Sequence, residues 1–216
     1  IYDGLININK TLIFNENEFI LIKEGSKLNF KNNANLIING GLEIRGTKSD
    51  SVDIYNSDSS KSSLLVLNAS FNSLISYTNF YSLSSLSESF WKNTSAVTFY
   101  NSNVKISNSK FFKNVAGDDA LNIVNTDHFS IDNCNFSNIL FDGIDIDFSD
   151  GIIINSIFSK IGNDAIDFSG SNSTVSNCFI NSIGDKGVSA GEASKVIVEA
   201  TSVSESKFGI VSKDLS

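Results

Sequence analysis

The second half of the chain repeats itself at a nearly fixed interval, and this repeat limits the possible folds more than any other feature. Similar residues recur every 22 positions over most of the stretch from Val104 to Ser212. The first passes are spaced 25 and then 23 residues apart, which indicates a short insertion. We expect two apolar columns, one of Ile131, Ile153, Val175 and Ile197 and one of Ile144, Ile166, Val188 and Ile210. A repeat of roughly 20 to 50 residues predicts a solenoid, in which each repeat stacks on the next.

Within each repeat, apolar and polar residues alternate over short runs, as they do from Gly143 to Phe148. This period of two indicates strands, and Asn, Ser, Gly and Asp separate them as turn residues. One repeat cannot bury its own apolar face, so successive repeats must pair edge to edge, and equivalent strands one coil apart are then parallel. The sequence therefore predicts an all-β fold, a single-stranded parallel β-helix of about nine coils.

We expect one domain over residues 1–216, because no linker or shift in composition divides the chain. Residues 1–50 have less regular spacing and Gly-rich corners, so we assign them to the opening coils, with 1–14 as a cap over the N-terminal edge. Residues 96–212 form the regular repeats of 22 to 25 residues. Because the pattern still runs near the last residue, we expect an open C-terminal end that continues into further coils or domains.

Register in such a rod places like residues on top of one another. We expect an inward aromatic column and, at a turn, an asparagine ladder whose side chains hydrogen-bond from coil to coil. The two columns are Phe111, Phe136, Phe158 and Ile180, and Asn108, Asn133, Asn155 and Asn177. Cys134 and Cys178 lie two coils apart, about 9.6 Å at ordinary strand spacing, so we expect free thiols with Ser156 between them.

The charge of the chain argues against two classes of partner. The formal net charge is −8, and Arg45 is the only arginine. Nucleic acids and anionic membranes select clustered Lys and Arg, so neither is an expected partner. The sequence also contains no apolar stretch long enough to span a membrane.

Acidic residues fall into columns when the coils are aligned. The turn before one strand of each repeat supplies Asp119, Asp142 and Asp164, followed by Lys186. The strand itself supplies Asn122, Asp145, Asp167 and Ser189, with Asp147 two residues after Asp145. Because apolar residues such as Ile144 and Ile166 alternate with the strand aspartates and face inward, these aspartates must face outward. Carboxylates about 5 Å apart repel one another, so we expect a cation, a raised pKa or a nearby lysine to offset the repulsion.

Three interpretations of these columns are open. In the first, the aspartates only bond to turn N–H groups and face water. In the second, they bind a hard divalent ion, Ca²⁺ above all, through the oxygen ligands Asp142, Asp145, Asp164 and Asp167. In the third, two carboxyl groups share a proton and act as acid and base on a glycosidic bond. The ligand-binding residues that we expect are Asp119, Asp145, Asp147 and Asp167, with Trp91 as an aromatic surface for sugar stacking.

Coils of this length, the asparagine column and corners of the type Gly117-Asp-Asp-Ala resemble the pectate lyase-like right-handed parallel β-helix superfamily. The resemblance implies a right-handed coil, a location outside the cell or on its surface, and polysaccharide as the ligand class. It also implies a Ca²⁺ role for the four aspartates named above and a base role for Lys160 or Lys186. Asn93-Thr94 is followed by Ser95 instead of Asp, and the Gly-His-Gly and Arg-x-Lys elements are missing, which argues against polygalacturonase activity.

The function that we expect is a surface or secreted β-helix module that binds or presents polysaccharide, or that serves as a rigid spacer in a larger protein. The alternative is an enzyme that degrades polysaccharide, either a Ca²⁺-assisted uronate lyase or a glycoside hydrolase with two carboxylates. For the enzyme, the candidate catalytic residues are Asp142, Asp164 and Lys186. A groove walled by loops, with a lysine within reach of a bound sugar, would favour the enzyme over the module.

Overall fold

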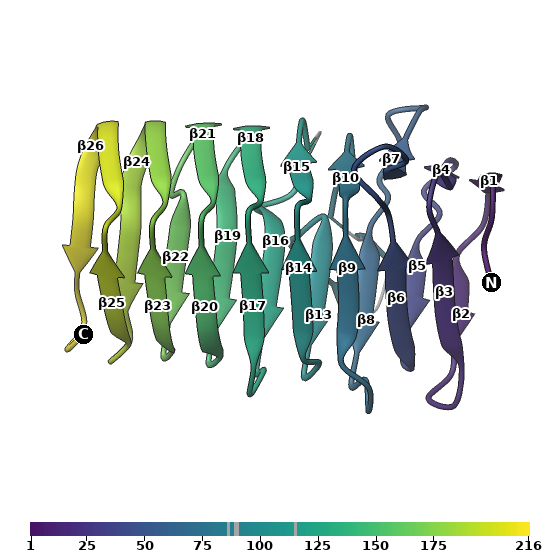
Figure 1. Ribbon diagram of the computed structural model, residues 1–216, viewed down its shortest axis with the longest axis horizontal. Helices are drawn as coiled ribbons and strands as arrows, with labels where there is room; N and C mark the ends of the chain where they lie inside the picture. The colour runs from purple at the N-terminus through teal and green to yellow at the C-terminus, as the bar shows by residue number, and fades with distance from the viewer. Residues whose placement is uncertain (86, 89–90, 115) are drawn as a thin grey trace.

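The computed structural model describes residues 1–85, 87–88, 91–114 and 116–216 and, in strands β11 and β12, the backbone alone. The described chain is a parallel β-solenoid of about nine turns, without helix. Strands of successive coils stand side by side along a rod that runs from the N-terminus to the C-terminus (Figure 1). A membrane-crossing helix is absent from these described residues. The all-β fold and the number of coils predicted from the repeat are therefore confirmed.

Each coil contributes three strands, which we name by the face of the rod on which they lie. Face 1 contains β1 (Leu5–Ile8), β4 (Lys27–Phe30), β7 (Val52–Asn56), β10 (Thr78–Tyr81), β15 (Lys110–Phe112), β18 (Asn135–Ile139), β21 (Ile157–Ile161) and the start of β24 (Phe179–Gly191). Face 2 contains β2 (Leu12–Phe14), β5 (Leu36–Ile38), β8 (Leu64–Leu67), β13 (Val97–Tyr100), β16 (Asp119–Val124), β19 (Asp142–Asp147), β22 (Ile166–Ser169) and the end of β24. Face 3 contains β3 (Phe19–Lys23), β6 (Gly41–Arg45), β9 (Ser73–Ser76), β14 (Val104–Ser107), β17 (Phe129–Asp132), β20 (Asp150–Ile154), β23 (Asn172–Ser176) and β25 (Lys195–Glu199).

Two strands depart from this simple scheme. Strand β24 runs around the corner from face 1 to face 2 and joins the two faces into one 16-stranded sheet. Strand β26 (Ser202–Ser212) pairs with β24 along both faces, with a register shift between Ile183 and Lys186. Between β10 and β13 the chain leaves the coil and forms an antiparallel pair of short strands, β11 (Ser87–Glu88) and β12 (Trp91–Lys92).

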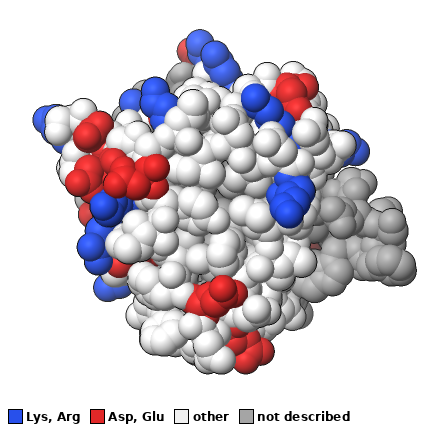
Figure 2. Space-filling view, turned by 90° about the vertical axis from the view of Figure 1, so that its right-hand side faces the viewer, with Lys and Arg blue, Asp and Glu red and all other residues white. Residues whose placement is uncertain are grey.

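The interior of the rod is filled by stacked apolar side chains, because parallel in-register pairing brings equivalent residues together. On face 1 the rings of Phe80, Phe111, Phe136 and Phe158 stack with centroids 4.6, 4.7 and 4.9 Å apart. Ile180 continues this column below Phe158. On face 2 the predicted column of Ile144, Ile166, Val188 and Ile210 is also in register. Viewed along the rod from its N-terminal end, most charged groups lie at the rim (Figure 2).

The predicted column of Ile131, Ile153, Val175 and Ile197 is wrong in its last member. Ile131, Ile153 and Val175 are paired as expected, but the residue that pairs with Val175 is Val198. Ile197 pairs with Thr174 on the outer side and is 61% exposed. The step between β23 and β25 is one residue longer than the usual repeat, from Asn172 to Lys195, and a shift of one residue moves a side chain to the opposite face.

The asparagine ladder forms at the corner between faces 3 and 1, but it is interrupted. Asn108, Asn133, Asn155 and Asn177 all have a positive φ near 52°, a conformation that Asn tolerates better than most residues. Asn133 donates a hydrogen bond to Asn108 at 2.7 Å, and Asn177 donates one to Asn155 at 2.6 Å. Asn155 instead donates to the carboxylate of Asp132 at 2.8 Å, so one step of the ladder is missing.

Cys134 and Cys178 are buried free thiols, as expected. Ser156 lies between them in the same column. Its hydroxyl accepts a hydrogen bond from the Cys134 N–H, and its carbonyl accepts one from the N–H of Phe179, the residue after Cys178. The expected N-terminal cap over 1–14 is not a separate element. Strands β1 and β2 pair in parallel with β4 and β5 and therefore form the first coil themselves.

Candidate functional site

The aspartates of the turn gather where face 1 meets face 2, at a site that we call the acidic corner: Asp118, Asp119, Asp142 and Asp164. Asp119 and Asp142 open β16 and β19 and are paired in register. Asp164 lies one coil further on, and its N–H donates to Asp142 Oδ1 at 2.7 Å. Successive coils approach very closely beside this corner, since a Cβ on Gly162 would lie 1.9 Å from the carbonyl oxygen of Leu140.

The corner carboxylates are buried, which alternation along a strand did not predict. Asp119 and Asp164 are 2% exposed and Asp142 is 9% exposed, whereas Asp118 is exposed. Part of the turn-bonding interpretation is nevertheless correct, because Asp142 accepts the Asp164 N–H and Asp164 accepts the Lys186 N–H at 2.9 Å. The other part, that these groups simply face water, is wrong for the three buried members.

Asp119 is held by the segment that leads out of the excursion between β10 and β13. The hydroxyls of Thr94 and Ser95 each donate to Asp119 Oδ2 at 3.3 Å. Burial raises the pKa of Asp119 to about 8, and the nearby carboxylates of Asp142 and Asp118 add to this increase. An ionised Asp119 is therefore costly at this position unless a cation is present.

Asp142 occupies the centre of the corner. Its Oδ1 accepts hydrogen bonds from the Asp164 N–H and from the side-chain amide of Asn163, both at 2.7 Å. Burial raises the pKa of Asp142 to about 6, although these two donors oppose the increase. Carboxylate oxygens of Asp118, Asp119 and Asp142 lie within 4.8 Å of one another.

This group of three fits the needs of a hard divalent cation. Ca²⁺ binds oxygen at about 2.3–2.6 Å, so two oxygens on one ion lie no more than about 5 Å apart. Within the described parts of the chain, Asp119 Oδ1, Asp142 Oδ2 and both oxygens of Asp118 accept no hydrogen bond, which leaves an oxygen of each residue for an ion. No Lys or Arg of those parts forms an ion pair with any of the three.

The next coil neutralises its charge within the protein. Lys186 Nζ forms ion pairs with Asp164 at 3.1 Å and with Asp185 at 2.5 Å, and Lys207 contacts Asp185 at 3.2 Å. Burial raises the pKa of Asp164 even though Lys186 opposes the increase. The hydrogen bonds from Lys186 and Lys207 lower the pKa of Asp185. Desolvation lowers the pKa of the Lys186 amine, but the carboxylates of Asp164 and Asp185 raise it by more. The pKa is therefore raised, and Lys186 is held as a cation.

The strand aspartates form a second column on the outer side of face 2: Asn122, Asp145, Asp167 and Ser189 are paired in register. Asn122 donates to Asp145 Oδ2 at 3.3 Å and to Asp147 Oδ2 at 3.2 Å. Burial, followed by the charges of Asp119 and its acidic neighbours, raises the pKa of Asp145 to about 9. Burial also raises the pKa of Asp147. Asp167 Oδ1 and Ser189 Oγ are buried without a hydrogen-bond partner among the described residues.

The two predicted columns thus exist, but the carboxylates are grouped differently from the set predicted to bind a metal. The compact group combines Asp142 with Asp118 and Asp119, while Asp145 and Asp167 belong to the outer column and Asp164 is paired with Lys186. Lys160 makes no hydrogen bond or ion pair with any described side chain, and the side chain of Trp91 lies outside the described residues.

Several residues that shape the corner were not expected from the sequence. Thr94 and Ser95 contact Asp119 from the segment that immediately precedes the regular repeats. Leu140 and Phe141, which immediately precede Asp142, are 52% and 49% exposed. The only signal for them in the sequence is a pair of large apolar residues at a turn position, where the neighbouring coils have Gly162-Asn163 and Gly184-Asp185.

Part of the chain is similar to a known family, and the chain is also similar to a solved structure. Residues 119–216, a little under half of the chain, match the family described as a right handed beta helix region. No curated protein matches the chain. A solved structure described as the crystal structure of pectate lyase Pel9A aligns with 87% of this chain and 59% of that chain, at 12% identity and a TM-score of 0.42. The chain therefore spans 59% of the length of that structure. The chain folds as a right-handed parallel β-helix, and its residues 119–216 are similar to the family described as a right handed beta helix region.

Proposed function

We propose that the chain is a carbohydrate-binding β-helix module that holds Ca²⁺ at the acidic corner and binds polysaccharide along face 2. The observation that carries this proposal is the group of carboxylates of Asp118, Asp119 and Asp142, whose oxygens lie within 4.8 Å of one another without a protein cation among the described residues. A divalent ion would offset the repulsion between these carboxylates and would keep them ionised despite their burial.

The surroundings of the corner support carbohydrate as the ligand. Phe141 is half exposed next to Asp142, and a sugar ring can pack against an aromatic side chain while carboxylates accept hydrogen bonds from its hydroxyls. The outer column continues the same polar chemistry along the rod through Asp145 and Asp167. A rod that presents similar groups at each coil suits a chain molecule made of repeated polar units. We place such a module outside the cell or on its surface, as is typical of this fold class.

Calcium titration tests the metal. A ligand that binds only the folded state raises the melting temperature, so Ca²⁺ at millimolar concentration is expected to raise the Tm of the protein at pH 7. Asp142→Asn removes a charged ligand and is expected to reduce this increase strongly. Asp127→Asn is the matched control, because Asp127 is exposed and lies outside the corner. An unchanged Tm at millimolar Ca²⁺ would rule out the calcium site.

Binding to polysaccharide tests the second half of the proposal. The protein is passed over immobilised neutral and acidic plant polysaccharides with Ca²⁺ and again with EDTA. Retention that requires Ca²⁺ and is weakened by Asp142→Asn and by Phe141→Ala supports binding at the acidic corner. Retention that is the same in EDTA and in Asp142→Asn would contradict it.

A hydrolase with two carboxylates is the second candidate, and one observation favours it. Asp119 and Asp142 are neighbours in register, with pKa values raised to about 8 and about 6. Between those values one carboxyl carries a proton while the other is ionised, which is the division of roles that glycoside hydrolysis requires. Release of new reducing ends by the wild-type protein, lost in Asp119→Asn and in Asp142→Asn, would establish this activity. The lyase alternative is less favoured, because the nearby Lys186 is ion-paired and held as a cation instead of acting as a neutral base.

A further inference from the structure

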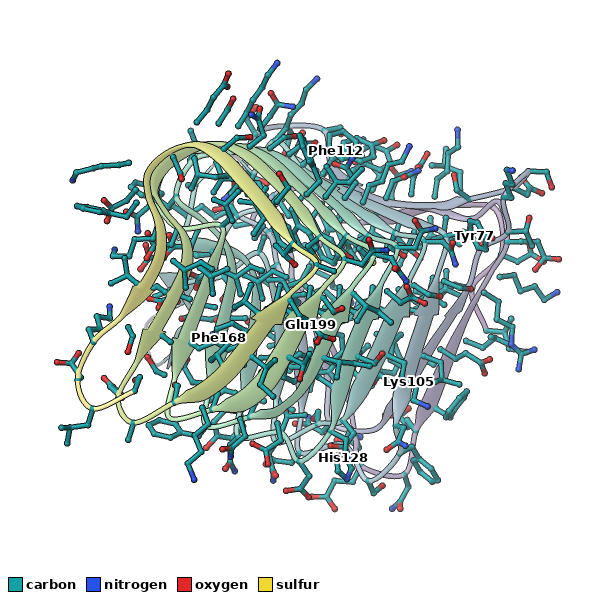
Figure 3. All side chains as sticks on the ribbon, turned by 60° about the vertical axis from the view of Figure 1, so that its left-hand side comes forward. Tyr77, Lys105, Phe112, His128, Phe168 and Glu199 are labelled. Atoms are coloured by element: carbon teal, nitrogen blue, oxygen red, sulfur yellow. The ribbon has the colours of Figure 1, made fainter. Side chains whose placement is uncertain are left out.

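A groove lies at a different corner of the rod, between faces 3 and 1, and the proposed function does not use it. Its volume is about 570 Å³, which is in the range of small-ligand sites. Asn108 and Asn133 of the asparagine ladder line the groove together with Tyr77, which lies one coil before Asn108. Figure 3 shows Tyr77 at the corner where these two faces meet. The turn of residues 47–50 closes one side with Thr47 and Lys48.

The wall of this groove is held in place by the backbone. Thr47 and Asp50 exchange hydrogen bonds between their N–H and carbonyl groups, and the Asp50 N–H also donates to Thr47 Oγ1 at 3.1 Å. The Gly25 N–H donates to the Asp50 carbonyl at 3.2 Å and ties the turn to the coil before it. At the base of the turn, a Cβ on Gly46 would lie 2.2 Å from the Tyr77 carbonyl oxygen, so the turn rests directly on the coil below.

Polar groups that line the groove are free to bind a ligand. Asn155 donates to Asp132 instead of to Asn133, so Asn133 Oδ1 accepts no hydrogen bond from the described residues. Asn108 stands at the first step of the ladder, where Tyr77 takes the place of an asparagine, and its Nδ2 has no acceptor among them either. One free donor and one free acceptor thus lie at the two ends of the hydrogen-bonded Asn108–Asn133 pair, and Tyr77 lines the same groove. This set of groups matches the hydroxyls and the ring of a sugar.

The charge of the groove differs from that of the rest of the molecule. Lys48 and Lys110 both line it, both are exposed, and neither forms an ion pair within the described chain. The lining residues include no Asp or Glu, although the chain as a whole has a net charge of −8. An anionic group in the groove therefore meets two unpaired ammonium groups and no carboxylate of the lining.

We propose that this groove binds an anionic saccharide without a metal. The carboxylate or sulfate of the sugar lies between Lys48 and Lys110. Its hydroxyls bond to Asn108 Nδ2 and Asn133 Oδ1, and its ring packs against Tyr77. This site is independent of the acidic corner. Its positive charge comes from two lysines of the protein, whereas the acidic corner requires a bound metal ion.

Binding in EDTA tests this site separately from the proposed function. Hexasaccharides of galacturonate, of sulfated heparin and of neutral cellulose are titrated into the ¹⁵N-labelled protein in EDTA at low ionic strength. One or both anionic hexasaccharides are expected to bind and to shift the side-chain amide signals of Asn108 and Asn133. The two anionic probes distinguish carboxylate from sulfate as the preferred group. Lys48→Gln combined with Lys110→Gln is expected to weaken binding about tenfold.

Lys10→Gln combined with Lys61→Gln is the matched control, because both lysines are exposed, neither is ion-paired in the described chain, and the change in net charge is the same. Binding that this control leaves intact supports the groove. An equal loss in both double variants would show general charge attraction and would overturn the proposal. It would also be overturned if neither anionic hexasaccharide bound in EDTA, or if the neutral one bound equally well.

Discussion

The chemistry of the acidic corner depends on single residues in positions where a carboxylate is normally unfavourable. Asp119 and Asp142 were placed in one column by the sequence repeat, and the structure pairs them in register. Their burial was not predicted, because inward and outward alternation is a rule for strands, whereas these residues stand where a strand begins at a corner. The covering residues Thr94 and Ser95 come from the irregular excursion, for which the repeat gives no register.

The raised pKa of Asp119 predicts a dependence of stability on pH. Its pKa is about 8 in the folded protein against an ordinary value of 3.8, so the folded state binds the proton more tightly than the unfolded state. Stability linked to this group is complete below its ordinary pKa and is lost as the pH rises through about 8. In EDTA, the free energy of unfolding is therefore expected to fall between pH 5 and pH 8 by on the order of 1–3 kcal/mol.

Asp119→Asn is expected to reduce this dependence, although Asp142 and Asp145, whose pKa values are also raised, still contribute to it. It is also expected to stabilise the calcium-free protein at pH 8, because the amide oxygen accepts the same hydroxyl donors without a charge. Urea unfolding at several pH values measures the effect. The exposed Asp127→Asn should behave like the wild type. A wild-type protein whose stability rises steadily from pH 5 to pH 8 in EDTA would contradict the assignment.

At the scale of strands, register could be predicted wherever the repeat length stays constant. Ile144, Ile166 and Val188 were placed correctly because each step is 22 residues. Ile197 was misplaced because one step contains an additional residue. A further column on the outer side of face 1, in which Tyr55, Tyr81 and Phe112 stack 5.0 Å apart, was not found at all. Its steps are 26 and 31 residues long, so its members do not align at the common interval.

Close contact between coils at the corner of faces 1 and 2 can be tested with one methyl group. In Gly162→Ala, the new Cβ would lie 1.9 Å from the Leu140 carbonyl oxygen, so the two coils must separate. We expect a loss of about 3 kcal/mol in the free energy of unfolding, measured by urea denaturation. Gly209→Ala adds the same methyl group to β26 where no atom lies within 4 Å, and it should cost much less. Equal effects of both changes would show that coil spacing does not limit this corner.

Over the whole molecule, stability comes from stacking of coils and does not require covalent links. Cys134 and Cys178 are buried and separated by the coil that carries Ser156. Burial raises the pKa of both thiols, that of Cys134 to about 12, which keeps them protonated and unreactive at neutral pH. The structure thus confirms that the two cysteines do not form the disulfide that their spacing excluded.

Reductant is accordingly expected to leave the Tm unchanged. A thiol reagent should modify both cysteines rapidly in denaturant and only slowly in the native protein, with mass spectrometry as the measurement. Cys134→Ser and Cys178→Ser place a hydroxyl where other coils already have Ser109 and Ser156, so each variant should fold. A fall in Tm on reduction, or rapid modification of native protein, would refute this account.

The column of phenyl rings inside face 1 also restricts how the core can move. Phe111 and Phe136 each have a parallel ring on both sides, at 4.6–4.9 Å, so neither can rotate about its Cβ–Cγ bond unless the adjacent coils move apart. Rotation of these rings therefore reports transient opening of the rod in its middle. In a proton spectrum the two sides of each ring should give separate resonances, and the temperature at which they merge would measure how often neighbouring coils part.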